Sequence, residues 1–497
     1  MQTKEVTIST PFELWPWQER AIKRFAYQHH AFLKHIMGAG KTVTTLLLIS
    51  LIKERYGRVP RSLILAPCST LWAWEREARS VFPEFADSMM VLEQTTEKKL
   101  KVFDEGYTEG KRVIVTNHES MISPNIVKRI RALKIELLVI DESQKMKSAK
   151  SKRVKAMFPI ADKAQYKYLL SGTPVTNEAE DIWAQLRMFG PGVCVPENFY
   201  SFIREYFYDK NAAWAHTKSH FPDYQLNPNR ADAFRAMIAS VMDVVEEADV
   251  TSLPPLVRAP RYVSLSSSIE KIYRGVERDF LAVLGDDAIS VDMALTRLTR
   301  LLQICSGVVK TDAGEELFLP TEKLEALEEI LVDITPTEKV IIWTPWRATY
   351  KPIVELCKRL KIKGVHASTA GGAKRQEMVD MFQNDPEVRV FLANPASMGV
   401  GVNLQAASTM VYFAKTFNLE HDQQSEARAR RGNSVHAHIK RIDLITRDTE
   451  EERVEEALRK KVSLQSYIFS RKSGREQSTE TTQAVTDVLN IFYGTTG

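Results

Sequence analysis

Short apolar runs alternate with amphipathic segments through the first 175 residues of the chain. Three of these runs are leucine-rich or β-branched and are bounded by polar or turn residues: 62–66, 113–116 and 137–141. Such runs are typical of strands that are buried on both faces of a parallel sheet. Helical patterns lie between them, at 71–81 and 124–133. The alternation predicts a doubly wound α/β lobe.

A second alternation of the same type begins near residue 320. Strands are expected there at 339–343, 363–366, 388–393 and 409–413. Long helical and aromatic-rich segments dominate the stretch before it. The predicted fold class is therefore α/β, with two parallel-sheet lobes and a mainly helical insertion between them. The expected domains are lobe one at 1–190, the insertion and linker at 191–319, lobe two at 320–470 and a polar tail at 471–497.

A glycine turn before an apolar helical segment suggests a phosphate-binding loop. It consists of six consecutive residues: Met37, Gly38, Ala39, Gly40, Lys41 and Thr42. In such a loop, backbone N–H groups face the phosphates, Lys41 reaches the β and γ oxygens, and Thr42 can ligate Mg²⁺. The full pattern has glycine where this chain has His35. On this fragment alone, a glycine turn beside a buried helix stays open as an alternative.

Two further patterns fall at the ends of predicted strands. Asp141 and Glu142 end the run at 137–141, where a triphosphatase holds Mg²⁺ with the first carboxylate and activates water with the second. Ser171-Gly-Thr-Pro174 ends another short apolar run. The carboxyl edge of a parallel sheet is where α/β folds bind ligands. We therefore expect both segments at one ATP site.

Two polar segments lie far from this region in the sequence. Gln18 precedes an amphipathic helical pattern, and a glutamine amide can pair with adenine by donating and accepting together. Gln424, Arg428 and Arg431 have the spacing of one helix face. Arginines that reach a γ-phosphate from a second domain stabilise the charge that develops during transfer. By itself, each segment also fits an ordinary helix.

Composition narrows the class of protein only slightly. The net charge is +5, from 68 basic and 63 acidic residues, which permits a polyanionic partner without requiring one. The four cysteines are far apart in the sequence, which argues against a zinc site or a disulfide framework and fits a reducing cytosol. Apolar runs long enough to span a bilayer are not found, so no membrane association is expected.

In their order, these motifs resemble those of superfamily-two helicase-like ATPases, and within them the Swi/Snf-type group. Other stretches resemble the group's remaining motifs: 65–71 (Ia), 115–119 (Ib), 340–344 (IV), 397–404 (V) and 424–431 (VI). Leu253-Pro-Pro, the segment 300–306 and Glu322-Lys-Leu match this group more specifically. The resemblance covers about residues 10–470 and implies RecA-like lobes.

Three segments within the motifs depart from the group's pattern. His35 and Ile36 stand where acidic residues are usual, motif II ends in Ser143-Gln144 instead of Ala-His, and Ala427 replaces Asp or Gly in motif VI. None of them removes a group that hydrolysis needs.

The resemblance implies a monomeric, DNA-stimulated ATPase that uses ATP and Mg²⁺, closes its lobes around ATP and moves along duplex DNA. It implies a nucleotide contact at Gly401 and phosphate contacts to DNA, for which the candidates are Ser69, Thr70, Asn117, His118, Lys145, Lys147, Ser397 and Asn403. We expect remodelling of replication, repair or recombination intermediates. The compact chain suggests a phage or bacterial protein, cytoplasmic and nucleoid-associated, with nucleosome sliding less favoured. The alternatives are a strand-separating DNA or RNA helicase, a DNA-binding module without turnover, and the motor of a nuclease system.

Overall fold

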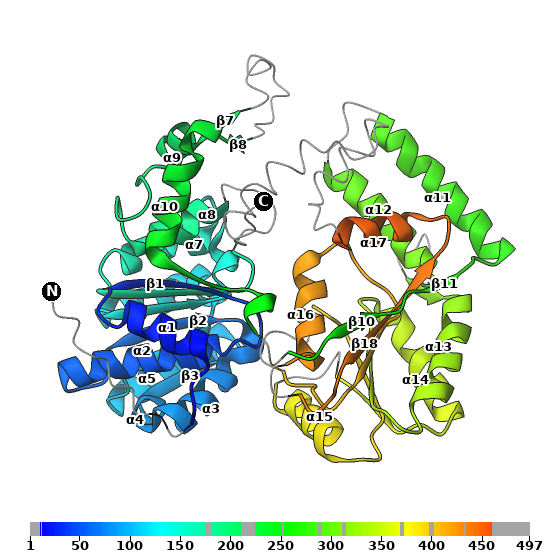
Figure 1. The fold of residues 1–497 in the computed structure, drawn as a ribbon, viewed down its shortest axis with the longest axis horizontal. Coiled ribbons are helices and arrows are strands. Elements are labelled where there is room, and N and C mark those ends of the chain that lie inside the picture. The colour runs from blue at the N-terminus through cyan, green and yellow to red at the C-terminus, as the bar shows by residue number, and fades with distance from the viewer. Residues whose placement is uncertain are drawn as a thin grey trace. The chain divides into compact units, whose positions relative to one another are not determined.

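The chain divides into two compact units (Figure 1). The computed structural model describes residues 10, 12–174, 181–209, 224–250, 253–285, 291–310, 315–367, 372–396, 402–431 and 434–459. The described residues up to 250 belong to unit 1, and those from 253 belong to unit 2. Within them, no helix is both long and apolar enough to cross a membrane.

Unit 1 contains a seven-stranded parallel sheet in the order β3-β4-β2-β5-β6-β1-β9. Its strands are β1 (His30–His35), β2 (Ser62–Ala66), β3 (Met89–Leu92), β4 (Val113–Asn117), β5 (Leu137–Asp141), β6 (Tyr166–Ser171) and β9 (Met242–Val245). Successive residues of β2 face opposite cores, with Leu63 and Leu65 in one and Ile64 and Ala66 in the other. The sheet is therefore covered on both faces, as its continuous apolar runs predict.

Helices form the two outer layers of unit 1. One layer consists of α1 (Pro16–Phe25), α2 (Lys41–Tyr56), α3 (Leu71–Val81) and α4 (Pro83–Asp87). The other contains α5 (Thr96–Thr108), α6 (Pro124–Ala132), α7 (Lys152–Ala161), α8 (Ile182–Leu186), α9 (Phe199–Tyr206) and α10 (Ala231–Val241). α2 ends at Tyr56, and Gly57 directly after it has a φ of 66°, the left-handed cap conformation that glycine adopts most easily.

The stretch predicted as a separate insertion at 191–319 is divided between the two units. α9 and α10 pack Phe202 and Phe234 into the unit 1 core, and α10 continues directly into β9, which extends the sheet. A short antiparallel pair, β7 (Phe207–Asp209) and β8 (Tyr224–Leu226), lies between these helices in the sequence. Burial of these apolar faces is the physical reason that this half of the stretch joins unit 1.

Unit 2 contains the second parallel sheet, in the order β10-β18-β17-β14-β16-β15, with β11 also paired to β18. The strands are β10 (Leu256–Arg258), β11 (Arg261–Val263), β14 (Val340–Trp343), β15 (Gly364–His366), β16 (Val390–Ala393), β17 (Thr409–Tyr412) and β18 (Ile439–Thr446). The prediction of two parallel-sheet α/β lobes is confirmed.

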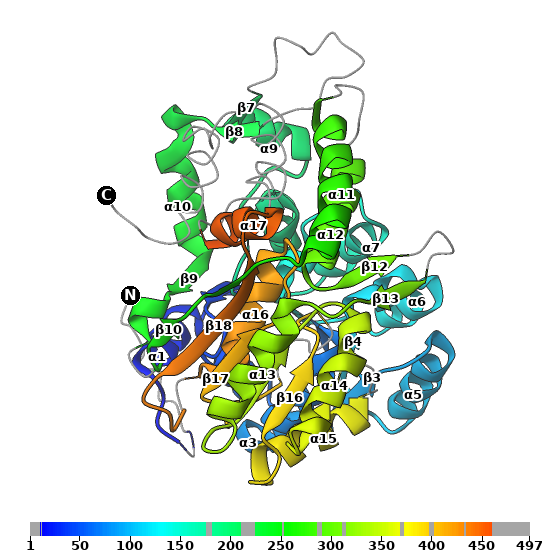
Figure 2. The same cartoon turned by 90° about the vertical axis from the view of Figure 1, so that its right-hand side faces the viewer.

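Helices cover both faces of this sheet as well (Figure 2). α13 (Glu322–Ile334) and α14 (Tyr350–Arg359) lie on one face, and α15 (Gly372–Asn384) and α16 (Leu419–Ala429) lie on the other. A third apolar cluster joins α11 (Ser267–Gly285), α12 (Val291–Cys305) and α17 (Glu450–Arg459). A short hairpin of β12 (Val308–Lys310) and β13 (Glu316–Phe318) follows α12. The second half of the predicted insertion therefore belongs to unit 2.

Candidate functional site

Three neighbouring strands of unit 1 end at one edge of the sheet, and each carries a predicted motif there. The phosphate loop follows β1, the acid pair ends β5, and the Ser-Gly-Thr-Pro turn follows β6, which lies between the other two. The strand register pairs Asp141 with Leu170 and Lys34 with Ser171. Because the strands are parallel, the sheet brings the three motifs together at its carboxyl edge.

The phosphate loop has the backbone geometry that its glycines predict. Gly38 and Gly40 have φ values of 85° and 72°, a backbone region that residues other than glycine rarely adopt. A Cβ atom on Gly40 would also lie 2.4 Å from the Gln18 amide nitrogen. α2 begins at Lys41 with no side-chain cap on its first turn. Its leading N–H groups can therefore serve an anion, which fits a bound triphosphate.

Lys41, the fifth residue of the phosphate loop, lies within the electrostatic influence of the acid pair. Its Nζ donates to the main-chain oxygens of His35 at 2.8 Å and Ile36 at 3.2 Å. Burial lowers the pKa of Lys41, while the charges of Glu142 and Asp141 act to raise it. An ammonium group between main-chain carbonyls and two carboxylates is positioned to bind a phosphate oxygen.

Asp141 is buried and held in one orientation. Its Oδ2 accepts from Trp74 Nε1 at 3.1 Å, and its Oδ1 accepts from the Glu142 N–H at 3.0 Å. Burial raises the pKa of Asp141, and the nearby Lys41 opposes this shift. The His118 ring donates to the Asp141 main-chain oxygen at 2.8 Å. These contacts fix the strand end that carries the carboxylate.

The residues present fit the predicted Mg²⁺. Mg²⁺ keeps several waters and phosphate oxygens, so it needs only one or two protein ligands. Thr42, the second residue of α2, and Asp141, the last residue of β5, would supply a hydroxyl and a carboxylate from the same sheet edge. Among the described residues, no group of three His, Cys, Asp or Glu side chains gathers into a metal cluster.

Gln144, one of the departures from the family pattern, connects motif II to motif III. Its Nε2 donates to Glu142 Oε2 at 2.6 Å, and its Oε1 accepts from Ser171 Oγ at 2.7 Å. Ser171 Oγ in turn accepts from the Thr173 N–H at 3.0 Å. All these side chains except Thr173 are buried. The amide therefore holds the second carboxylate, a role that the sequence pattern left undefined.

Gln18 contacts the phosphate loop. Its Oε1 accepts from the Trp15 N–H at 3.0 Å, and its Nε2 donates to the Gly40 oxygen at 3.4 Å. Trp17 Nε1 donates to the Ala39 oxygen at 3.1 Å. The start of α1 therefore packs against the loop, next to the place where the adenine contact is predicted. That contact itself stays a prediction.

In unit 2, Gln424 and Arg428 lie on α16, as their spacing predicts, and both side chains are buried. Arg431 does not share that helix, and this part of the prediction was wrong. α16 ends at Ala429, and Arg430 has an extended conformation with ψ of 94°. Arg430 Nε donates to the Pro254 oxygen at 2.8 Å, and Arg431 Nη2 donates to the Val402 oxygen at 2.9 Å. These main-chain acceptors hold the arginines after the helix has ended.

A buried arginine that the sequence analysis did not single out anchors α16 to the sheet. Arg441 on β18 donates to Asp422 at 2.6 and 3.0 Å and to Glu426 at 2.8 Å. It also donates to Asp443 at 3.1 Å. Its guanidinium carbon lies 4.1 Å from the centre of the Tyr412 ring. The i, i+4 acid pair on α16 is the sequence signal that could have suggested such a partner.

The predicted DNA contacts differ in exposure. Ser69, Asn117, Lys145, Lys147 and Asn403 are partly exposed, whereas Thr70 and His118 are buried. Some of these side chains already have protein partners. Lys147 forms an ion pair with Asp181 at 3.0 Å, and Asn117 accepts from Lys99 and donates to Glu119. Ser397 and Gly401 lie outside the described residues. Their contacts with DNA or nucleotide stay predictions.

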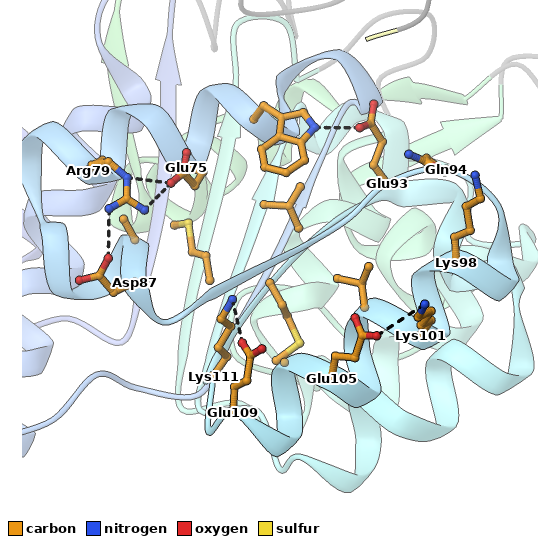
Figure 3. Close-up of a pocket in the computed structure, with 17 residues that line it drawn as sticks. Glu75, Arg79, Asp87, Glu93, Gln94, Lys98, Lys101, Glu105, Glu109 and Lys111 are labelled. Atoms are coloured by element: carbon orange, nitrogen blue, oxygen red, sulfur yellow. Dashed lines mark hydrogen bonds and ion pairs between the residues drawn. The ribbon is translucent and has the colours of Figure 1, made fainter. Parts of the chain in front are cut away.

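A groove of about 780 Å³ lies along β3, α3, α4 and α5, at the opposite end of the sheet order from β1. Figure 3 shows its charged side chains in pairs: Arg79 with Glu75 and Asp87, Lys101 with Glu105, and Lys111 with Glu109. Charges of both signs neutralise one another here. No residue of the phosphate loop lines the groove, so the two are separate. Because its charges are of both signs, the groove does not have the cationic lining that a triphosphate requires.

Similar proteins are known over nearly the whole chain. The chain is 25% identical over 501 residues to the CHD3-type chromatin-remodeling factor PICKLE of Arabidopsis thaliana, covering 92% of this chain and 34% of that protein. It is 24% identical to the mouse chromodomain-helicase-DNA-binding protein 1-like, covering 90% of this chain and 49% of that protein. The chain thus spans a third to a half of the length of these relatives.

Among solved structures, the chain is similar to the Sulfolobus solfataricus SWI2/SNF2 ATPase core in complex with dsDNA. The two chains align over 99% of each, with a TM-score of 0.43 and 20% sequence identity. The family is shown by two domain models instead. The SNF2-related domain matches residues 18–308, more than half of the chain, and the helicase conserved C-terminal domain matches residues 322–433. The chain therefore belongs to the SNF2-related family of superfamily-two helicase-like ATPases.

Proposed function

We propose that the chain is a DNA-stimulated ATPase that couples ATP hydrolysis to movement on duplex DNA. The observation that carries this proposal is the carboxyl edge of the unit 1 sheet. There the phosphate loop, the acid pair and the motif III turn lie on three neighbouring strands. Membership of the SNF2-related family adds the expectation of a motor.

Each residue at this edge has a proposed role. Lys41 and the leading N–H groups of α2 bind the β- and γ-phosphates. Thr42 and Asp141 hold Mg²⁺, which when bound neutralises phosphate charge and orients the γ-phosphate. Glu142 takes a proton from the attacking water, with its carboxylate held by Gln144.

The remaining roles follow the family pattern. Gln18 and Gly401 contact the nucleotide, and Gln424, Arg428 and Arg431 of unit 2 stabilise the charge that develops on the transferred phosphate. Burial of Arg428 favours a strong interaction with a phosphate, because the local dielectric is low.

We propose that the protein moves along double-stranded DNA and that its contacts with the DNA are to phosphate groups. The names of both relatives support a DNA or chromatin track. The finer proposal is that the motor remodels replication, repair or recombination intermediates. Phosphate contacts predict sequence-independent binding that weakens as salt rises.

ATP hydrolysis by wild type, Lys41→Ala and Glu142→Gln, measured with and without duplex DNA, tests the proposal. We expect DNA to stimulate the wild type. Lys41→Ala should lose ATP affinity, whereas Glu142→Gln should bind ATP and turn it over at least ~10²-fold more slowly, because the water is no longer activated. Wild-type turnover in Glu142→Gln would contradict the assignment of the base.

The track is tested by comparing stimulation by duplexes, forks, four-way junctions, single-stranded DNA and RNA. Displacement of a third strand from a DNA triplex reports movement along a duplex without strand separation. Stimulation by RNA alone, or unwinding of the duplex itself, would favour the strand-separating alternative.

A further inference from the structure

The first position of the phosphate loop pattern is occupied by a buried histidine with one partner of its own. His35 is fully buried, and its Nε2 lies 2.9 Å from Asp243 Oδ2. A carboxylate only accepts, so Nε2 carries the proton and donates. His35 Nδ1 is buried and has no hydrogen-bond partner among the described residues. Burial lowers the pKa of His35, which favours the neutral ring with its proton on Nε2.

Asp243 is held from a second side by α1. Arg20 donates through Nε to Oδ1 at 3.2 Å and through Nη2 to Oδ2 at 3.1 Å. Arg20 Nη2 also donates to the Val244 oxygen at 2.8 Å. Burial acts to raise the pKa of Asp243, but His35 and Arg20 outweigh it, so the pKa is lowered. The group is therefore a charged carboxylate shared between two hydrogen-bond donors, and Arg24 of α1 forms a longer ion pair with its Oδ1 at 3.8 Å.

α1 also contacts the far end of the loop. Trp17 donates to the Ala39 oxygen and Gln18 donates to the Gly40 oxygen. Together these bonds close a ring that runs from Asp243 through His35 and the loop to α1, and back through Arg20. Because Asp243 is the second residue of β9, which continues directly from α10, the ring also ties the loop to this edge of the sheet.

We propose that Asp243 is a positioning residue for ATP binding. It fixes the position of the phosphate loop through His35, and through Arg20 it holds the loop against α1, the helix that carries the predicted adenine contact Gln18. This proposal rests on the proposed ATPase function. In this proposal, neither His35 nor Asp243 contacts the nucleotide. Both fix the loop that carries Lys41 and the leading N–H groups of α2.

Asp243→Asn removes the shared acceptor with little change in shape. An amide presents one oxygen and one NH₂ group. If the oxygen takes the place of Oδ2, it can accept from His35 and from Arg20 Nη2, but the NH₂ group then faces Arg20 Nε, which loses its acceptor. If the NH₂ group faces His35, the ring must place its proton on the buried Nδ1, which has no partner among the described residues. In either orientation the variant removes the carboxylate charge and sets an NH₂ group against a donor, Arg20 Nε in one case and His35 in the other.

The experiment measures the Kd of a fluorescent ATP analogue, the kcat and KM for ATP, and the unfolding temperature. The matched control is Glu136→Gln. Glu136 accepts from Arg58 at 2.6 and 2.9 Å and from Arg61 at 3.0 Å, and it lies directly before β5, at the amino edge of the same sheet. We expect Asp243→Asn to weaken binding and raise KM about tenfold or more, with the control at wild-type values.

A double variant separates positioning from general stability. If Asp243 acts through His35, then His35→Asn and Asp243→Asn together should weaken ATP binding no more than the stronger single variant does. Additive losses would overturn the proposal, as would control-like binding by Asp243→Asn. Should Asp243→Asn unfold well below the control, Arg20→Gln decides: weaker binding at an unchanged unfolding temperature supports the proposal, and wild-type binding overturns it. A wild type that binds no ATP would refute the proposed function instead.

Discussion

Arg441 offers a direct test of how unit 2 holds the helix that carries Gln424 and Arg428. Only 1% of its side chain is exposed, and its guanidinium donates to carboxylates on both α16 and β18. Arg441→Met keeps most of the volume and an apolar contact with the Tyr412 ring. It removes the charge and leaves Asp422, Glu426 and Asp443 close together.

The expected cost follows from what the variant leaves behind. Removing one member of a buried ion network costs about 3–5 kcal/mol, because the remaining charges stay desolvated. Other cations offset part of this cost: Lys415 lies 2.6 Å from Asp443, and Arg258 lies 2.8 Å from Glu426. For a domain of this size, each kcal/mol lowers the unfolding temperature by about 2–4 °C. The full cost would correspond to roughly 6–20 °C, and because these cations offset part of it, we expect the transition of unit 2 to fall by up to that amount.

Differential scanning calorimetry of the full chain measures this decrease, and hydrogen exchange of the α16 amides locates it. The control is Arg359→Met, which breaks an exposed pair with Glu328 of the same unit at 2.6 Å. Exposed pairs contribute about 0–1 kcal/mol, so the control should unfold within about 4 °C of the wild type.

Adding Asp422→Asn and Glu426→Gln to Arg441→Met neutralises the two carboxylates of α16. We expect this triple variant to recover part of the lost unfolding temperature. Equal unfolding temperatures for Arg441→Met and Arg359→Met would refute the reasoning. So would a decrease in Arg441→Met that leaves the exchange of the α16 amides unchanged.

Two further predictions concern unit 1. Gln144→Ala should lower kcat about tenfold with little change in the Kd for ATP, because it releases Glu142 and leaves Lys41 in place; equal losses in both constants would contradict this. Arg58, assisted by Arg61, holds the pKa of Glu136 at about 2, below its ordinary 4.5. A carboxyl whose pKa is lower in the folded state than in the unfolded state stabilises the fold at pH values above its unfolded pKa. The stability difference between wild type and Glu136→Gln should therefore be complete above pH 4.5 and shrink as the pH falls toward 2. A difference that does not vary with pH in thermal unfolding would exclude this linkage.

The fold was predictable where strands are apolar and short. The runs at 62–66 and 137–141 are β2 and β5 with unchanged bounds. The sequence analysis did not identify β9 or β18, because polar residues interrupt their apolar pattern. Arg441 is buried on β18 with Asp422 and Glu426 of α16 as partners, and Asp443 is paired with Arg441 itself and with Lys415. A local pattern does not contain the pairing with α16, which joins segments 15 or more residues apart.

The site was predictable to the level of motifs. Spacing placed the phosphate loop and the acid pair at one sheet edge, and the parallel register of β1, β6 and β5 brings them there. Spacing failed at Arg431, since helical periodicity does not show where a helix ends. Beyond the end of α16, Arg430 and Arg431 donate to the main-chain oxygens of Pro254 and Val402, which lie 29 or more residues away in the sequence.

The two departures from the family pattern within unit 1 have one physical feature in common. His35 and Gln144 are both buried polar side chains, and each is bonded to a carboxylate: Asp243 for the first and Glu142 for the second. A buried polar group is stable only when its partners are in place. Replacing either side chain with one that cannot donate would therefore leave a buried carboxylate without this donor. We expect His35→Gly to weaken ATP binding although it completes the glycine pattern, because Asp243 would lose the donor through which it fixes the loop.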